Sequence, residues 1–75
     1  MLKKRSLLLA GHATSLALEP EFWAVLEAMA AAEGLSLAGL IARIDAERER
    51  SLLASACRVR ALAWASGLPN RDRST

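Results

Sequence analysis

The chain has few of the residues with which small proteins form stabilising disulfides or metal sites. It contains one cysteine, Cys57, and one histidine, His12. A lone cysteine cannot form an intrachain disulfide, and two potential ligands cannot complete a structural zinc site, which needs four. A chain of 75 residues buries only about 60% of its unfolded surface and is marginal alone. Association with a second copy is therefore the remaining route to a stable fold.

Long apolar runs are also missing. No stretch approaches the roughly 20 apolar residues that span a bilayer. The basic residues 3–5 and the apolar run 7–10 follow each other in the order of a signal peptide. Gly11 and His12 interrupt that run before it reaches the usual length of about 7–15 residues. We therefore expect a cytoplasmic protein with no membrane segment.

The sequence lacks the patterns that are typical of an active site. It contains no glycine-rich phosphate-binding loop, and nothing in it orients His12 toward a nucleophile. Cys57 falls in an apolar helical segment, where a buried, unreactive thiol is the usual outcome. The carboxylates fall on polar helix faces, where charge mostly serves solubility. The prediction is a protein that is not an enzyme and has neither a metal site nor a cofactor.

Charge is distributed unevenly along the chain. The formal net charge is only +2, yet the N-terminal arm, residues 1–4, carries Lys3 and Lys4, and Arg5 follows it. A basic arm beside a charge-free segment could meet an anionic partner such as nucleic acid. The simpler interpretation is a solubilising segment, and the charge pattern alone favours this interpretation.

Composition predicts one mainly helical domain. Hydrophobic residues make up 53% of the chain and are rich in alanine and leucine, which favour helix. We expect a single domain over residues 1–69, closed by Gly67 and Pro69, and a disordered tail over residues 70–75.

A short extended segment precedes the first helix. Leu16 and Leu18 share one face of a predicted strand over residues 13–18, because side chains alternate with a period of two. Pro20 and Glu21 then suit the first turn of a helix. Residues 5–10 are a candidate first strand; they either form a hairpin with residues 13–18 or continue into them as one bent strand, with a bend at residues 11 and 12. A strand without a partner in its own chain must pair with a second copy.

Helical periodicity continues to the end of the domain. The first predicted helix runs from about Pro20 to Glu33, with Gly34 as its C-terminal cap. Ser36 is a suitable N-cap for a second helix. Residues 37–66 could form one long helix or two helices broken near Ser51, which could cap the second of them, a third helix of the domain from about Leu52 to Ser66. The apolar positions of the third helix form one stripe of Leu52, Ala56, Val59 and Ala63, and a neighbouring one of Leu53, Cys57 and Trp64. Phe22, Trp23 and Trp64 are predicted to anchor a core or interface.

This order of strand, helix, glycine turn and helix resembles the ribbon-helix-helix family, the fold of the Met and Arc repressors. It is most similar to a bacterial branch with an added N-terminal segment and a third helix. The residues that carry the resemblance are Lys4-Arg5-Ser6, Ala10-Gly11-His12, Thr14-Ser15, Leu18-Glu19-Pro20-Glu21-Phe22-Trp23, Gly34-Leu35-Ser36-Leu37 and Ile44-Asp45.

The resemblance implies a mainly α fold with a short β ribbon, in which two or three helices follow the strands. It implies an intertwined homodimer whose strands pair antiparallel between subunits. The core that the two subunits would share consists of Leu16, Leu18, Phe22, Leu26, Leu40, Ile41 and Ile44.

The resemblance also implies DNA binding through a ribbon in the major groove. Carried over by position, the outward strand residues are Ala13, Ser15 and Ala17, and Ser36 would help to hold a phosphate. The basic residues Lys3, Lys4 and Arg5 would neutralise further phosphates. The two alanines depart from the family pattern, because they can touch a thymine methyl group but cannot form bidentate contacts. The alternative is a dimeric module on the same fold that binds a protein partner or a further copy of the dimer.

Overall fold

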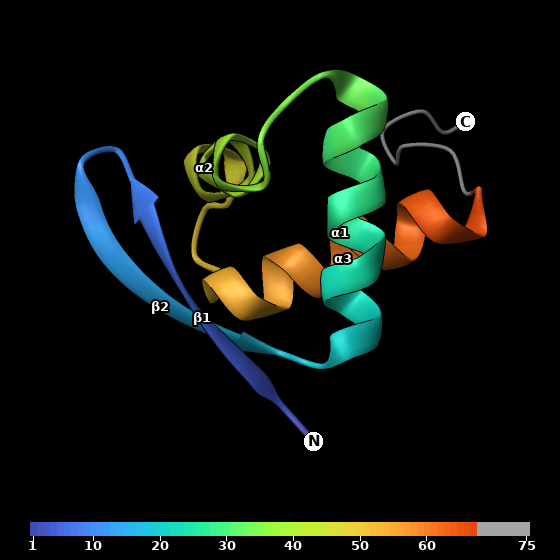
Figure 1. Ribbon diagram of the computed structural model, residues 1–75, viewed down its shortest axis with the longest axis horizontal. Helices are drawn as coiled ribbons and strands as arrows, with labels where there is room; N and C mark the ends of the chain where they lie inside the picture. Colours follow the sequence, from blue (N-terminus) through green and yellow to red (C-terminus); the bar gives the residue numbers. More distant parts are fainter. Residues whose placement is uncertain (68–75) are drawn as a thin grey trace.

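Two strands and three helices follow one another in the computed structural model, which describes residues 1–67. They are β1 (Lys3–Leu9), β2 (His12–Leu18), α1 (Pro20–Glu33), α2 (Leu37–Glu47) and α3 (Leu53–Ser66). The predicted mainly α fold with a short β ribbon is confirmed. The β1–β2 hairpin curves along one side of the helices, with its tip beside α2 (Figure 1). The predicted tail, residues 70–75, lies outside the described residues.

The two strands form an antiparallel hairpin within one chain. Their register runs from Lys3 opposite Leu18 to Leu9 opposite His12. This result decides between the two alternatives that the sequence left open, since residues 5–10 pair with residues 13–18 and do not continue into them as a bent strand. Lys3 and Lys4, which belong to the predicted basic arm, form the first positions of β1. Pairing between subunits stays a prediction.

The hairpin turn consists of two residues, and both have a left-handed backbone. The φ angle is 51° at Ala10 and 83° at Gly11. Two positive φ angles match the type I′ turn that joins twisted strands, and this turn favours Asn-Gly. Glycine adopts this conformation freely, whereas alanine does so at a cost in free energy.

Replacing Ala10 with Asn should therefore stabilise the protein. Asparagine tolerates the left-handed region, so we expect the free energy of unfolding to rise by about 0.5–1 kcal/mol. Urea denaturation followed by circular dichroism measures the change. Ala13→Asn, on the exposed strand beside the turn, is the control and should bring no gain. An Ala10→Asn protein no more stable than the wild type would contradict this account of the turn.

Local capping signals set both ends of α1 and the start of α2. Pro20 occupies the first turn of α1, and Gly34 ends the helix in the left-handed conformation, with φ of 69°. The amide of Leu35 donates to the carbonyl of Ala30 at 2.8 Å, which closes the cap. Ser36 caps α2 as predicted, because its hydroxyl accepts the Gly39 amide at 2.9 Å.

The helix that follows α2 differs from the expectation in its start and in its buried face. The chain does break after Glu47, but Leu52 and not Ser51 is the N-cap of α3. Arg48 stabilises the connection by donating to the Asp45 carboxylate and to the Ser51 carbonyl, both at 2.6 Å. The predicted stripes were wrong in part. Cys57 and Ala61 are buried, whereas Leu52, Val59 and Trp64 are exposed. Periodicity placed apolar residues on all sides of this helix and therefore could not indicate which side packs.

Helix α3 closes the core within one chain. It packs against α1, α2 and β2, and the buried residues of all these elements form one cluster. Of the residues predicted as a shared dimer core, Phe22 is half-buried, and the others are buried inside the single chain: Leu16, Leu18, Leu26, Leu40, Ile41 and Ile44. These side chains already have partners in their own subunit, so their contact with a second subunit stays a prediction.

No single helix within residues 1–67 is long and apolar enough to cross a membrane. Helices α1 and α2 pass that test of length and composition only as a pair, and they are bent by 96°. Their apolar residues line the core described above.

Candidate nucleic-acid interface

The hairpin presents one face to the helices and one to the outside. Opposite residues of an antiparallel pair share a face, and faces alternate along each strand. The outer face, as we call it, consists of three opposite pairs: Lys4 with Ala17, Ser6 with Ser15, and Leu8 with Ala13. All six residues are exposed except Ala17, which is half-buried.

The three strand residues predicted from the sequence therefore lie together on the outer face. Ala13, Ser15 and Ala17 alternate with the buried Leu16 and Leu18. Sequence reasoning missed Ser6 and Leu8 as partners in this face. The alternation from Lys4 to Leu8 is a signal for them, but only the pairing register of the hairpin places them beside β2.

The hairpin is free of acidic residues. The first acidic residue of the chain is Glu19, so the N-terminal 18 residues carry cations only. Lys3 and Lys4 are exposed, and neither takes part in the ion pairs found within residues 1–67. Positive charge without nearby carboxylates gives this end of the molecule a positive potential, which suits an anionic partner.

Arg5 does not join Lys4 on the outer face. It points to the helices, where its guanidinium stacks over the Trp23 ring at 4.7 Å and pairs with Glu27 at 2.8 Å. The Trp23 indole Nε1 in turn donates to the carbonyl of Lys3 at 2.8 Å. Of the three predicted phosphate-binding residues, Arg5 thus anchors β1 to α1, while Lys3 and Lys4 remain open to solvent.

Ser36 lies in the connection between α1 and α2, away from the hairpin in the sequence. Its hydroxyl is already engaged with the Gly39 amide. A methyl group at residue 39 would lie only 3.1 Å from the Ser36 Oγ, so glycine suits the close approach of this cap. A phosphate at this helix start would therefore meet backbone amides rather than the serine hydroxyl.

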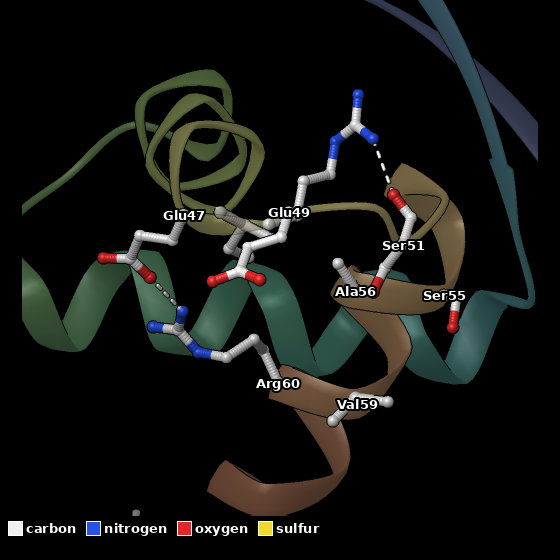
Figure 2. A pocket seen from close by; sticks show the side chains of 9 residues that line it. Glu47, Glu49, Ser51, Ser55, Ala56, Val59 and Arg60 are labelled. Atoms are coloured by element: carbon white, nitrogen blue, oxygen red, sulfur yellow. Dashed lines mark hydrogen bonds and ion pairs between the residues drawn. The ribbon is translucent and has the colours of Figure 1, made fainter. Parts of the chain in front are cut away.

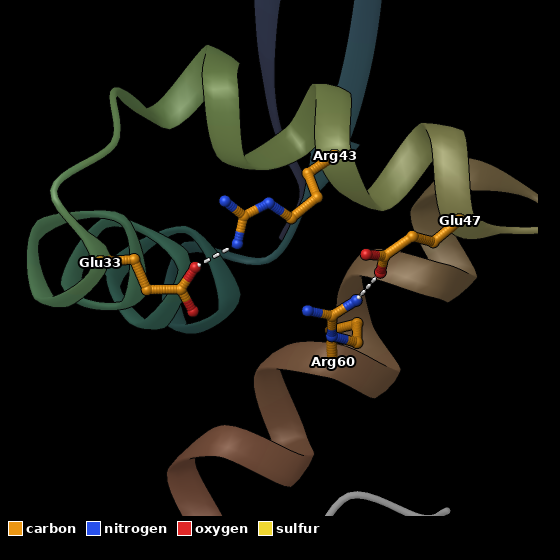
Figure 3. Close-up of polar contacts among 4 residues, drawn as sticks. All are labelled: Glu33, Arg43, Glu47 and Arg60. Carbon is orange, nitrogen blue, oxygen red and sulfur yellow. Dashed lines mark hydrogen bonds and ion pairs between the residues drawn. The ribbon is translucent and has the colours of Figure 1, made fainter.

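Ion pairs neutralise most arginines on the helices. Arg43 of α2 pairs with Glu33 at 2.8 Å, and Arg60 of α3 pairs with Glu47 at 2.5 Å (Figure 3). Arg58 pairs with Glu19 at 2.9 Å and thereby lowers the pKa of that carboxyl group. These side chains connect helices and leave the hairpin as the cationic end of the described chain.

A pocket of about 400 Å³ lies between the end of α2 and the start of α3 (Figure 2). Glu47 and Glu49 face it together with Arg60, and Ile44 and Val59 also line it. Mixed charges make this pocket a poor site for a phosphate. It lies on the helices and contains no residue of the outer face.

The groups most often used in catalysis are not assembled within residues 1–67. Cys57 is buried, and burial followed by the nearby Asp45 charge raises the pKa of its thiol to about 11. The thiol is thus protonated at neutral pH and is a weak nucleophile. No group of three or more His, Cys, Asp or Glu side chains in this part of the chain could hold a metal ion.

Comparison with known proteins agrees with this geometry. A family model described as a ribbon-helix-helix domain matches residues 2–65. Among solved structures, the chain is similar to an uncharacterized protein from Bordetella pertussis Tohama I, with 33% sequence identity and a TM-score of 0.73. The match covers 99% of this chain and 72% of that one. No curated protein matches the chain.

Proposed function

Because the chain belongs to the ribbon-helix-helix family, a regulatory fold without enzymatic activity, we propose that it is a homodimeric DNA-binding protein. In this proposal it is a transcriptional regulator that presents the outer face of its ribbon to the major groove. The observation that carries the proposal is the acid-free hairpin with two exposed lysines that take part in none of the ion pairs within residues 1–67.

The dimensions of the hairpin support groove entry. Paired strands lie about 4.8 Å apart, and the major groove, about 12 Å wide, admits a two-stranded ribbon. Serine and alanine side chains at the centre of the outer face are short, so the backbone can approach the bases closely. Lys3 and Lys4 lie at the open end of the hairpin, where long flexible side chains can reach phosphates on either side of the groove.

The salt dependence of duplex binding tests the proposal. Fluorescence anisotropy with labelled duplex DNA between about 50 and 200 mM salt should show affinity that falls steeply, with a slope of about −0.9 per neutralised phosphate. The double variant Lys3→Ala/Lys4→Ala removes four cations from a dimer and should reduce the magnitude of that slope by up to about four.

Arg50→Ala is the matched control. Arg50 is an exposed cation in the connection between α2 and α3, so its loss changes net charge without touching the hairpin. It should leave the salt slope close to that of the wild type. A wild-type protein that binds no duplex at about 50 mM salt, or a double variant with an unchanged slope, would contradict the proposed function.

The free edges of the hairpin support the dimer. Within residues 1–67 each strand has a neighbour on one side only, and a two-stranded hairpin is marginal without a further strand or a packed face. The family pairs the strand that precedes its first helix with the same strand of a second copy. Pairing β2 with β2 of the partner would form a two-stranded ribbon at the centre of a four-stranded sheet, and this central β2–β2 ribbon is the part that fits the major groove.

Proline substitutions should identify the edge that pairs. A two-residue turn closes on a hydrogen-bonded pair, and such pairs alternate along the ladder. The amides of Ser6 and Ser15 are therefore expected to point away from the hairpin, toward the free edges of β1 and β2. Ser15→Pro should convert dimer to monomer in analytical ultracentrifugation, because it removes a donor and crowds the β2 edge.

Ser6→Pro is the matched control, since it blocks the β1 edge at the residue directly opposite Ser15. It should leave the dimer intact. Dimers in both variants would show that the subunits do not pair through strand edges. A monomer from Ser6→Pro alone would move the interface to β1.

Helix α3 supports a second candidate, a dimeric module for protein–protein interaction. Its solvent side carries the exposed residues Leu52, Val59 and Leu62 at helical spacing. An unpartnered apolar stripe of this kind suits a helix of another protein or a further copy of the dimer. The double variant Val59→Ser/Leu62→Ser discriminates the two candidates. Under the second candidate it should reduce the assembly that sedimentation measures. Under the first candidate it should leave duplex binding unchanged.

A further inference from the structure

The core of this protein is complete within one subunit. Buried residues of the hairpin and of all three helices form one cluster, and none of them is more than 5% exposed. Leu18 of β2, Leu40 of α2 and Cys57 of α3 have no exposed surface at all. An intertwined dimer instead shares its core, so that a subunit without its partner leaves core residues open to water. This subunit leaves no part of the cluster open, because α3 packs against α1, α2 and β2.

The elements that were predicted to share a core between subunits offer little to a second copy. Within residues 1–67 the exposed large hydrophobic residues lie in residues 1–8 or 52–64, and β2, α1 and α2 have none. Phe22, the half-buried member of the predicted dimer core, lies beneath the Arg58 guanidinium, 5.9 Å from the ring centre. A second subunit placed against these elements would bury little apolar surface, which is the main component of obligate dimer interfaces.

The contact that remains is the free edge of β2. This strand runs from His12 to Leu18, so antiparallel pairing with β2 of the partner uses its whole length when it is centred on Ser15. Such a ladder consists of backbone hydrogen bonds, which replace hydrogen bonds to water and contribute little net free energy each. They do not offset the freedom of motion that two subunits lose on association. The two acid-free hairpins are both cationic and also repel each other.

Duplex DNA removes both obstacles to pairing. Its phosphates neutralise Lys3 and Lys4 of each subunit, and two subunits bound in one groove are held at a high effective concentration. We propose that the free subunit is a folded monomer at low concentration and that duplex DNA assembles the central β2–β2 ribbon from two subunits. This inference rests on the proposed DNA binding and adds to it how the binding site is formed and regulated. Free protein dimerises only when concentrated, which is the condition for the Ser15→Pro comparison in the ultracentrifuge.

Disulfide trapping tests whether DNA brings the subunits together. The central residue of an antiparallel ribbon lies opposite its own copy at a Cα–Cα distance of about 5.5 Å, which a disulfide can bridge. At about 1 µM protein, Ser15→Cys should oxidise to a covalent dimer at least about tenfold faster with duplex DNA at low salt than without it, because the bound pair is at an effective concentration near mM. Cys57 is buried and does not compete. Ser6→Cys, on the β1 edge directly opposite Ser15, is the matched control and should not respond to the duplex.

The wild type supplies a second measurement that leaves the hairpin unchanged. Its duplex-binding isotherm should be sigmoidal, with a Hill coefficient of about two, while sedimentation and circular dichroism of the free protein at the same concentration should show a folded monomer. A free protein that is already dimeric or is unfolded at about 1 µM would overturn this inference and leave DNA binding intact. Trapping of Ser15→Cys at the same rate with and without the duplex, or trapping through Ser6→Cys alone, would do the same. A wild type that binds no duplex would overturn the proposed function and this inference together.

Discussion

Leu16→Asp is expected to leave the chain unfolded. Leu16 is 5% exposed and lies in the core cluster between the hairpin and the helices. Truncating a buried leucine costs about 2–5 kcal/mol, and burying an uncompensated carboxylate costs several more. The total reaches the whole stability of an ordinary small domain, about 5–15 kcal/mol, and a 75-residue chain belongs at the lower end of that range.

The cation opposite this position does not rescue the variant. Arg5 shares the inner face with residue 16, but its guanidinium is already held by Glu27 and the Trp23 ring. An aspartate at residue 16 would compete for that cation and weaken the link between β1 and α1.

Circular dichroism and one-dimensional NMR measure the outcome. Ser15→Asp, one residue away on the outer face, is the control and should fold, because its carboxylate remains in water. A Leu16→Asp protein that is folded and monomeric would contradict both the core described above and the proposed dimer.

Trp23→Ala is expected to lower the free energy of unfolding by about 3–5 kcal/mol, the range for large aromatic residues in cores. Trp23 is 2% exposed, so the substitution leaves a cavity at the base of the hairpin. It also removes the donor to the Lys3 carbonyl and the ring under Arg5. We therefore expect the start of β1 to separate from α1 before the helices unfold.

Trp23→Phe separates the two contributions. Phenylalanine keeps most of the apolar volume but has no indole donor, so the part-buried Lys3 carbonyl loses its partner at a cost of about 1 kcal/mol. Hydrogen exchange should then be faster at the β1 amides than at those of α2. Urea denaturation measures the loss in free energy of unfolding for both Trp23→Ala and Trp23→Phe.

Trp64→Phe is the matched control, because Trp64 is 45% exposed and lies on α3. Its effect should stay within about 0.5 kcal/mol, as for most surface substitutions. Equal losses from the two tryptophans would show that the Trp23 site does not anchor the hairpin.

The candidate site was predictable to the extent that it depends on one strand. Alternation along residues 13–18 placed Ala13, Ser15 and Ala17 opposite the buried leucines, and the structure has them so. The predicted basic residues included Arg5, which instead stabilises the fold. A charge count cannot separate it from Lys4, because neighbours on a strand point to opposite faces and only the packed helices show which face is inside.

Local signals in the sequence by themselves determined the ends of α1 and the start of α2, since Pro20, Gly34 and Ser36 act through their own backbone angles and nearest amides. The tertiary structure decided the pairing of β1, the buried side of α3 and the role of Arg5. Each of these depends on contacts between residues far apart in the chain. Apolar residues lie on all sides of α3, so its sequence does not indicate which side is buried. The sequence of residues 5–10 likewise does not indicate which segment they pair with or which face of the strand packs on the helices.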